Sequence, residues 1–332
     1  MNPEIDDLLA LYSSLGSEFP SADVYVARQL NARPSLRIAK DSEGNPTLLI
    51  SAKSMIKAAV PPLEFRYLSF QPRFLCRIRG EGMPESIETF AVVKCTTNDG
   101  LLREYFLRCL TGLVAAFSDI LTEDEVAALV TKLVELFRAI EDAPRASLQG
   151  IWCELFLISR ATRIRQAAIA WHADPKELYD FVAGKQRLEV KSTTGPHRVH
   201  VFRLEQLLPL RETRVVIASF MLEECGRGIS INDLWSEILA NPQITIELRE
   251  RLSKILALSL GRDWRKAHYV AFDPDAASNK MRLYDVTSIP KVDPSVPAEV
   301  SDIRFKSEVT DTPTLSRGDV VRLGGLFEAM FG

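Results

Sequence analysis

The chain has little of what marks secreted, zinc-ribbon or membrane proteins. Its cysteines are few and scattered, and no two of them form a Cys-x-x-Cys pair: Cys76, Cys95, Cys109, Cys153 and Cys225. This spacing argues against a zinc ribbon, and the odd count favours reduced thiols. No apolar run approaches the roughly 20 residues that a membrane span needs. The acidic opening MNPEIDDLLALYSSL has the wrong charge for a signal peptide. We therefore expect a cytoplasmic protein.

Motifs of nucleotide-dependent enzymes are also missing. We find no Walker loop, no Gly-x-Gly-x-x-Gly, no His-rich cluster and no internal repeat, which disfavours an ATPase or a dinucleotide enzyme. The net charge of −3 argues against a protein coated in basic residues. The segment from Arg160 to Arg214 is an exception, because 11 arginines and lysines face six acids there. Such local excess is consistent with a phosphate-contacting cleft, although solvated arginines remain an alternative for Arg160, Arg163 and Arg165.

A chain of 332 residues that is 46% hydrophobic has room for two domains. Residues 1–120 predict a β-rich module with flanking helices, including a hairpin around Glu43–Pro46. Aromatics alternate with arginines over residues 65–79, a pattern that a half-buried sheet explains better than a nucleic-acid surface. We assign residues 121–290 to a second domain. Residues 291–332 form a C-terminal extension that is expected to pack on its core.

The stretch Tyr179–Lys191, YDFVAGKQRLEVK, carries the strongest functional signal. It predicts a strand containing Asp180, a turn at Ala183–Gln186, and a second strand. Glu189 and Lys191 are two residues apart and therefore share one face of that strand. The turn would bring Asp180 beside them. Two carboxylates next to an ammonium suit a hard divalent cation that also holds a water and a phosphate oxygen, whereas a surface ion pair is the simpler alternative.

Glu154 is the second candidate. It is the only charge in the predicted helix GIWCELFLIS, and no residue three or four positions away can pair with it. A buried carboxylate without a partner is costly, so Glu154 either meets a cation from outside its helix or accepts a hydrogen bond from a neighbouring loop.

Several residues after Lys191 are suited to contacts with nucleic acid. Ser192 and Thr193 offer hydroxyls to phosphates. Arg198 and His200 share a face of a predicted third strand and could point toward a duplex, although an edge strand with a hydrated polar face explains the alternation equally well. Gln206, in the short helix that follows, is a weaker site candidate. The apolar run Arg214–Met221 reads as a strand buried on both faces.

The chain has a helix bearing Glu, then a strand bearing Asp, then Glu-x-Lys on the next strand. This order of elements resembles that of the PD-(D/E)XK nuclease superfamily. Within it, the runs GIWCELFLIS and YDFVAGKQRLEVKSTTGPHRVHVFRLEQL resemble one bacterial family often encoded beside methyltransferases and ATPases in restriction or phage-defence islands. The resemblance is most specific from Gly150 to Leu208. One departure is Cys153, where the family pattern has glycine before Glu-Leu. The resemblance implies an α+β, or α/β, restriction-endonuclease-like core of helix, three-strand meander, helix and strand within residues 121–290.

The resemblance also implies roles for the candidate residues. Glu154, Asp180, Glu189 and Lys191 would be catalytic, with Asp180, Glu189 and Glu154 around Mg²⁺, for which Mn²⁺ could substitute. Ser192, Thr193, Arg198, His200 and Gln206 would contact double-stranded DNA. The expected activity is Mg²⁺-dependent endonucleolytic cleavage in a restriction-modification or phage-defence system, with methyltransferase or ATPase subunits as partners. The alternative is an inactive DNA-binding or scaffold subunit with the same fold. The sequence leaves open whether the chain forms a homodimer.

Overall fold

The computed structural model describes residues 7–332 except 17–18, 20, 22, 32, 52–60, 81–83, 115–119, 142–145, 173–176, 209–211, 293–299 and 301. The chain divides into two compact units, Met1–Arg138 and Ala139–Gly332. The first unit therefore extends past the expected boundary at residue 120 and includes the helix Glu123–Ala139. None of the helices in the described part of the chain is long and apolar enough to cross a membrane.

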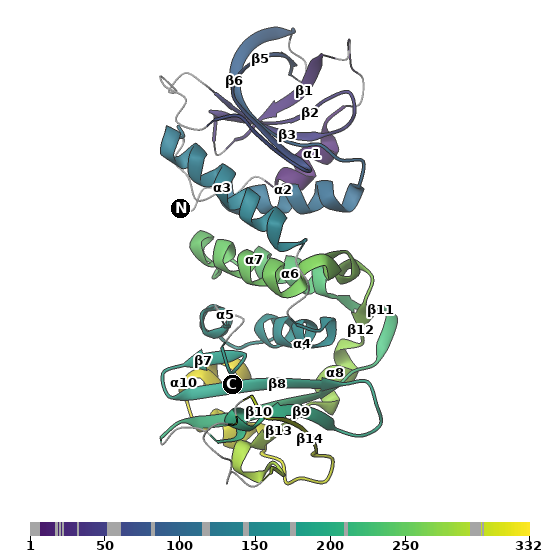
Figure 1. Ribbon diagram of the computed structural model, residues 1–332, viewed down its shortest axis with the longest axis vertical. Helices are drawn as coiled ribbons and strands as arrows, with labels where there is room; N and C mark the ends of the chain where they lie inside the picture. Colours follow the sequence, from purple (N-terminus) through teal and green to yellow (C-terminus); the bar gives the residue numbers. More distant parts are fainter. Residues whose placement is uncertain are drawn as a thin grey trace. The chain divides into compact units, whose positions relative to one another are not determined.

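Within its described residues, the first unit has a six-stranded sheet and three helices (Figure 1). Its strands are, in sheet order, β1 (Val24–Gln29), β2 (Leu36–Lys40), β3 (Pro46–Ser51), β6 (Ser86–Cys95), β5 (Leu68–Arg79) and β4 (Leu63–Phe65). The sheet closes on itself because β1 also pairs in parallel with β5. The helices are α1 (Leu8–Ser14), α2 (Gly100–Val114) and α3 (Glu123–Ala139). The predicted hairpin at residues 43–46 is confirmed: β2 pairs with β3 from Lys40↔Pro46 onward.

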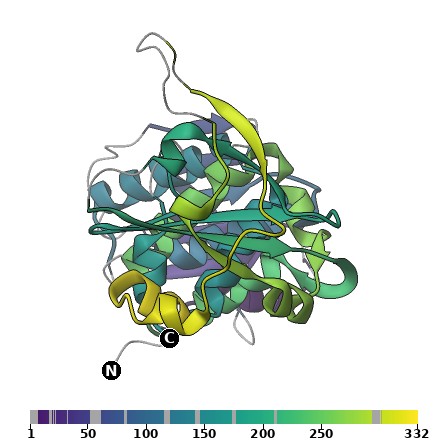
Figure 2. The ribbon, with the colours of Figure 1, turned by 90° about the horizontal axis from the view of Figure 1, so that it is seen from below.

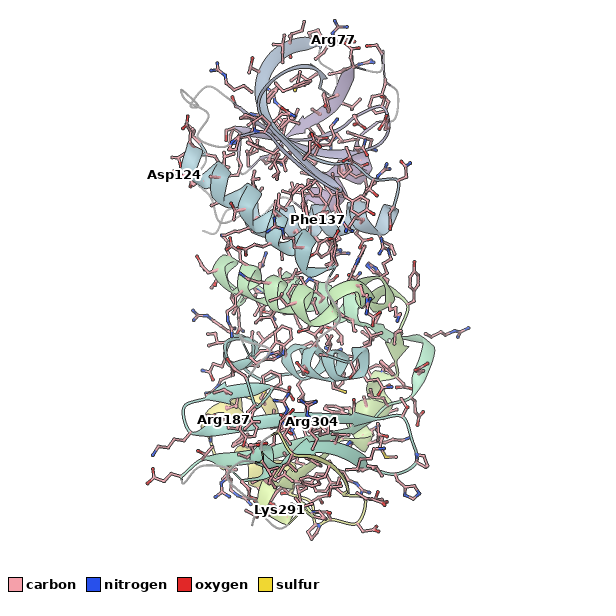
Figure 3. All side chains as sticks on the ribbon, in the orientation of Figure 1. Arg77, Asp124, Phe137, Arg187, Lys291 and Arg304 are labelled. Atoms are coloured by element: carbon pink, nitrogen blue, oxygen red, sulfur yellow. The ribbon has the colours of Figure 1, made fainter. Side chains whose placement is uncertain are left out.

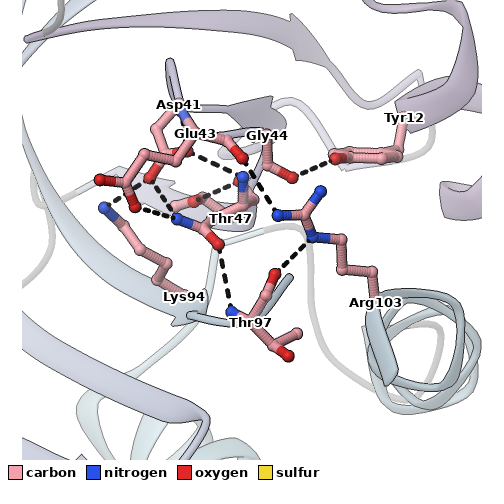
Figure 4. A network of polar contacts seen from close by, with 9 residues as sticks. Tyr12, Asp41, Glu43, Gly44, Thr47, Lys94, Thr97 and Arg103 are labelled. Carbon is pink, nitrogen blue, oxygen red and sulfur yellow. Dashed lines mark hydrogen bonds and ion pairs between the residues drawn. The ribbon is translucent and has the colours of Figure 1, made fainter. Parts of the chain in front are cut away.

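A buried polar network holds the β2–β3 turn against the rest of the first unit (Figure 4). The Asp41 carboxylate accepts hydrogen bonds from the backbone N–H groups of Glu43 and Asn45, and from the Lys94 ammonium at 3.0 Å. Arg103 of α2 donates to the carbonyl oxygens of Glu43 and Thr97. Because these groups satisfy one another, the turn is fixed from both the sheet and α2.

The second unit has a four-stranded mixed sheet in the order β13–β10–β8–β7. Its strands are β7 (Phe181–Ala183), β8 (Gln186–Thr193), β10 (Arg214–Met221) and β13 (Arg282–Asp285). The apolar strand β10 lies between β8, to which it is parallel, and β13. Two helices, α4 (Leu148–Ser159) and α5 (Ile164–Ala170), lie between this sheet and the pair α6 (Ile231–Ala240) and α7 (Ile246–Leu260) (Figure 1). The second unit is thus a mixed α and β structure with a helix-covered sheet.

The predicted three-strand meander is wrong in its third strand. β9 (Val199–Arg203) does not join the sheet beside β8 but pairs with β14 (Arg304–Glu308), about a hundred residues later, as a separate two-stranded ribbon. The physical reason is that β10 takes the place next to β8. Its run RVVIASFM is apolar on both sides, and a central position buries both of its faces.

The remaining elements connect and cover this core. They are the 3₁₀ helices η2 (Leu204–Leu207), η3 (Gly261–His268) and η4 (Val286–Ser288), the strands β11 (Glu224–Ser230) and β12 (Ala271–Phe272), and the helices α8 (Pro274–Lys280), α9 (Arg317–Val321) and α10 (Gly325–Phe331). The strand β12 has only two residues, and η3 before it continues to His268. At the C-terminus the Gln186 side chain bonds to Leu323, Gly324 and Leu326, which ties the segment before α10 to β8.

Candidate active site

The β7–β8 hairpin brings the motif residues together. Its turn includes Gly184 in the left-handed region at φ +53°, and Ala183 pairs with Gln186 across it. Glu189 and Lys191 lie on one face of β8, and the Lys191 Nζ donates a hydrogen bond to Glu189 Oε1 at 2.6 Å. The predicted turn and shared face are therefore present in the structure.

Asp180 lies immediately before β7 rather than inside a strand, which corrects the expected strand over Leu178–Val182. The chain bends at residues 178–180, and regular pairing begins only where Phe181 meets Leu188 and Trp171. The Asp180 Oδ2 accepts the backbone N–H of Val190 at 2.6 Å. Val190 stands between Glu189 and Lys191, so this bond holds the Asp180 carboxylate against the Glu-x-Lys segment.

The site acids repel one another. Burial raises the pKa of the Asp180 carboxyl well above its usual range, and the negative charges of Glu189 and Glu154 raise it further. The Val190 N–H and the Lys191 ammonium oppose the shift but do not cancel it. The ionised form of Asp180 is therefore unfavourable in the metal-free site, and a bound metal ion would favour it.

Glu189 has one oxygen engaged and one oxygen without a partner. Its Oε1 accepts hydrogen bonds from Lys191 and from the Gln206 amide, each at 2.6 Å. Its Oε2 is buried and has no hydrogen-bond partner among the described residues. A buried carboxylate oxygen left unpaired costs free energy, so such an atom in a folded protein calls for an explanation, and an ion is one.

Gln206 connects the carboxylate to the neighbouring ribbon. Besides Glu189, its Nε2 donates to the Leu178 carbonyl at 2.9 Å, and its Oε1 accepts the backbone N–H of Arg203 at 3.0 Å. The sequence pointed to Gln206 only as a weaker DNA-contacting candidate. In the structure it is buried and holds the Glu189 carboxylate in position.

Glu154 meets groups that the sequence did not single out. Its Oε2 accepts a hydrogen bond from Trp171 Nε1 at 2.7 Å and lies 3.5 Å from His172 Nε2. This is the hydrogen-bonded alternative left open for a carboxylate on an otherwise apolar helix. Trp171 and His172 follow α5, and no motif or spacing marks them in the sequence. Glu154 nevertheless stands close enough to Asp180 to raise the pKa of that carboxyl.

Arg198 and His200 do not face outward as expected for a duplex contact. Both are buried, since the Arg198 guanidinium donates to the Ser219 carbonyl and hydroxyl and to the Lys280 carbonyl. His200 Nε2 lies 2.7 Å from the same Ser219 hydroxyl. Burial, together with the nearby Lys191 and Arg198 charges, lowers the pKa of His200 to about 4. The two side chains therefore secure β9 to β10, because their polar groups are already bonded inside the protein.

Ser192 and Thr193 end β8 and remain partly exposed. Thr193 lies on the face of Glu189 and Lys191, and its Oγ1 accepts the backbone N–H of Gly195 at 3.0 Å. Ser192 lies on the opposite face of the strand. Of the two hydroxyls, that of Thr193 is on the same side of the sheet as the motif carboxylate.

The described residues contain no group of three or more His, Cys, Asp or Glu side chains arranged to hold a metal ion. The three acids expected around Mg²⁺ are thus not gathered as one ligand set, because Glu154 is turned to Trp171 and His172. Asp180 and Glu189 still fit a hard cation: both are carboxylates, they lie on adjoining parts of one hairpin, and one oxygen is buried without a partner. Mg²⁺ commonly takes one or two protein carboxylates and completes its octahedron with water and phosphate oxygens.

Comparison with protein families places the chain in a known family. Residues 11–310 match the family model described as "Putative PD-(D/E)XK family member, (DUF4420)". The chain belongs to the DUF4420 family. Searches of curated proteins and of solved structures gave no significant match. Because the match spans nearly the whole chain, DUF4420 membership covers both units and not only the hairpin with the motif.

Proposed function

We propose that this DUF4420 protein is a Mg²⁺-dependent DNA endonuclease whose active centre is built on the β7–β8 hairpin. The observation that carries the proposal is the buried, unpartnered Oε2 of Glu189, next to the repelled carboxylate of Asp180 and to the Lys191 ammonium. The Glu189–Lys191 ion pair alone leaves this oxygen without a partner and leaves the ionised form of Asp180 unfavourable. A cation supplied from solution accounts for both.

Asp180 and Glu189 would hold the metal, which would polarise the phosphate and lower the pKa of the attacking water. The protein's own contribution is positional. Val190 N–H fixes the Asp180 carboxylate, and Gln206 fixes that of Glu189. The Lys191 ammonium lies between this carboxylate and solvent with 17% of its side chain exposed, and it would stabilise the negative charge that develops on the phosphate. Glu154 would act indirectly, because its negative charge raises the pKa of Asp180.

A second function, an inactive scaffold, is favoured by one observation. Glu189 is only 4% exposed, and its Oε1 is already bonded to both Lys191 and Gln206. A phosphate reaches the carboxylate pair only if this arrangement opens. A protein that kept the fold without turnover would retain such a closed pair. The resemblance to families encoded in restriction and phage-defence islands suits either role, with a methyltransferase or ATPase subunit as partner.

Plasmid cleavage separates the two functions. We expect the full chain to nick or linearise supercoiled DNA in Mg²⁺ or Mn²⁺, and Glu189→Gln to abolish the activity because it removes a metal-binding charge. The matched control is Glu237→Gln, which removes an acid that pairs with Arg160 on the exposed surface. If wild type and both variants leave the plasmid intact with either metal, alone and with candidate partner subunits added, the nuclease proposal fails and the scaffold stands.

A further inference from the structure

The ribbon formed by β9 and β14, whose yellow strand is seen in Figure 2, has one buried face and one exposed face. Five residue pairs define it, from Arg304↔Arg203 to Glu308↔Val199. Directly opposed residues of an antiparallel pair share a face, and successive residues alternate. His200, Phe202, Phe305 and Ser307 therefore point inward, and the other six residues point outward.

The inner face fixes the ribbon to the core of the second unit. Phe202 is fully buried in a cluster with Ile217 and Val309. Ser307 Oγ donates to the Pro290 carbonyl at 2.7 Å, and His200 bonds to Ser219. Because three of its inward residues are held by packing or hydrogen bonds, the outer face has a defined orientation.

The outer face combines apolar and cationic side chains. Val199 and Val201 are 44% and 51% exposed, although β-branched residues usually pack against a neighbour. In the ladder Lys306 is opposite Val201, Glu308 is opposite Val199, and Arg203 and Arg304 form the next outward pair (Arg304 is labelled in Figure 3). Lys306 lies directly opposite Val201 and makes no ion pair within the described residues. A solvated polar strand has no need for two exposed valines, one at its start and one at its centre.

We infer that the outer face of the β9–β14 ribbon is a binding surface for duplex DNA, with Arg203, Arg304 and Lys306 contacting phosphates and Val199 and Val201 facing the groove. The size fits, because two strands about 4.8 Å apart enter a major groove about 12 Å wide. The charge fits, because three cations and one acid, Glu308, line the face, which leaves it net positive. Valine methyl groups can contact the thymine methyl groups exposed in that groove. This inference rests on the proposed function, for which it supplies the substrate-holding surface.

The ribbon is also continuous with the candidate active site. The backbone N–H of Arg203 bonds to Gln206, whose amide holds Glu189. On the inner face, the Lys191 ammonium lies over the Phe202 ring, 5.1 Å from its centroid. DNA bound to the outer face would thus contact β9, the strand whose Arg203 and Phe202 make these two contacts with the candidate active site. A displacement of β9 on binding would act directly on the Gln206–Glu189 bond.

Asp302 pairs with two arginines of this surface and offers a test in which the variant should bind DNA more tightly. A variant that is merely misfolded would not show this gain. Asp302 stands at φ +55° before β14, and its carboxylate lies 2.9 Å from Arg304 and 3.9 Å from Arg203. Bound phosphate would compete with it for both guanidinium groups. Asp302→Asn removes the competing charge, and asparagine tolerates the left-handed backbone better than most residues.

The experiment is fluorescence anisotropy of the full chain with a labelled duplex in EDTA, so that neither metal binding nor cleavage contributes. We expect Arg304→Ala with Lys306→Ala to weaken binding about tenfold or more and to reduce the slope of log K against log salt by about two. We expect Asp302→Asn to tighten binding. The matched control, Lys266→Ala with Arg322→Ala, removes two exposed cations from η3 and the residue after α9 and should leave affinity unchanged.

A wild type that does not bind the duplex, or a ribbon variant that binds as tightly as the control, would overturn the inference. The second result would leave the ribbon as a surface for a protein partner. A failure of the nuclease proposal looks different: the wild type would bind duplex in EDTA with the predicted ribbon dependence, yet would neither respond to Mg²⁺ nor cut DNA.

Discussion

Replacement of Asp180 by Asn should stabilise the metal-free protein and remove its response to Mg²⁺. The amide keeps an oxygen that can accept the Val190 N–H, so the hairpin contact survives. The negative charge that Glu189 and Glu154 repel is lost. In the wild type the pKa of the Asp180 carboxyl is raised on folding, so the folded state binds more protons than the unfolded state. Its unfolding free energy therefore falls as the pH rises from about 4 toward the folded pKa, and the metal-free protein bears the whole penalty above it.

Mg²⁺ should reverse this penalty in the wild type alone. A ligand at 100 times its Kd adds about 2.7 kcal/mol to the unfolding free energy, which for a unit of 150–250 residues is about 5–11 °C in Tm. Thermal unfolding at pH 7.5 with EDTA or excess Mg²⁺ measures both effects. Asp180→Asn should show a higher Tm in EDTA and almost no metal increment. Glu237→Gln, an exposed acid of the same unit, should respond as the wild type does. An equal increment in Asp180→Asn would place the ion elsewhere and refute the reasoning.

Three further results are expected. Lys191→Ala should lower single-turnover cleavage about 10²–10³-fold at little cost in DNA affinity, and Lys191→Arg should not restore it, since a planar guanidinium cannot take the place of a compact ammonium; comparable rates in wild type and Ala variant would contradict this role. Gln206→Ala should cost about 1–3 kcal/mol in chemical unfolding, because it removes the buried partner of Glu189 Oε1 and of two backbone groups; no loss would show that water replaces the amide. Asp41→Ala should destabilise the first unit by about 2–3 kcal/mol. Burial alone would raise the pKa of Asp41, but hydrogen bonds from Asn45 and Lys94 lower it. The difference in unfolding free energy between wild type and Asp41→Ala should therefore shrink as the pH falls below about 4. A difference that persists at about pH 3 would argue against a charged network.

Local pattern was sufficient to predict the hairpin and the face that Glu189 and Lys191 share. Alternation with period two places Glu189 and Lys191 on one face whatever lies around them. The Gly-Lys pair after Ala183 favours a tight turn, because glycine adopts a positive φ at little cost. The helix carrying Glu154 and the buried strand β10 also follow from the spacing of their apolar residues. These features depend on neighbours a few positions apart, and a single sequence contains that information.

The pairing of distant segments could not be predicted from local sequence patterns. The alternation over His197–Arg203 predicted a strand, and β9 is one, but its partner β14 lies about a hundred residues later and its His200 faces inward. Period two identifies two faces without saying which is buried. Arg198 and His200 became interior residues because Ser219 and the Lys280 carbonyl could satisfy them. The hydrogen-bond partners of those side chains come from β10 and α8, and the spacing of nearby residues does not predict these partners.

The sequence by itself therefore identified the candidate residues of this DUF4420 protein: an acid before a hairpin, and an acid and a lysine on one strand. Only the tertiary structure decided what each acid meets. It directed Glu154 to Trp171 and His172, placed Gln206 on Glu189, and left one Glu189 oxygen buried without a partner. The physical reason is that side-chain type and strand period are local properties, whereas burial and hydrogen-bond satisfaction depend on which distant segments pack together.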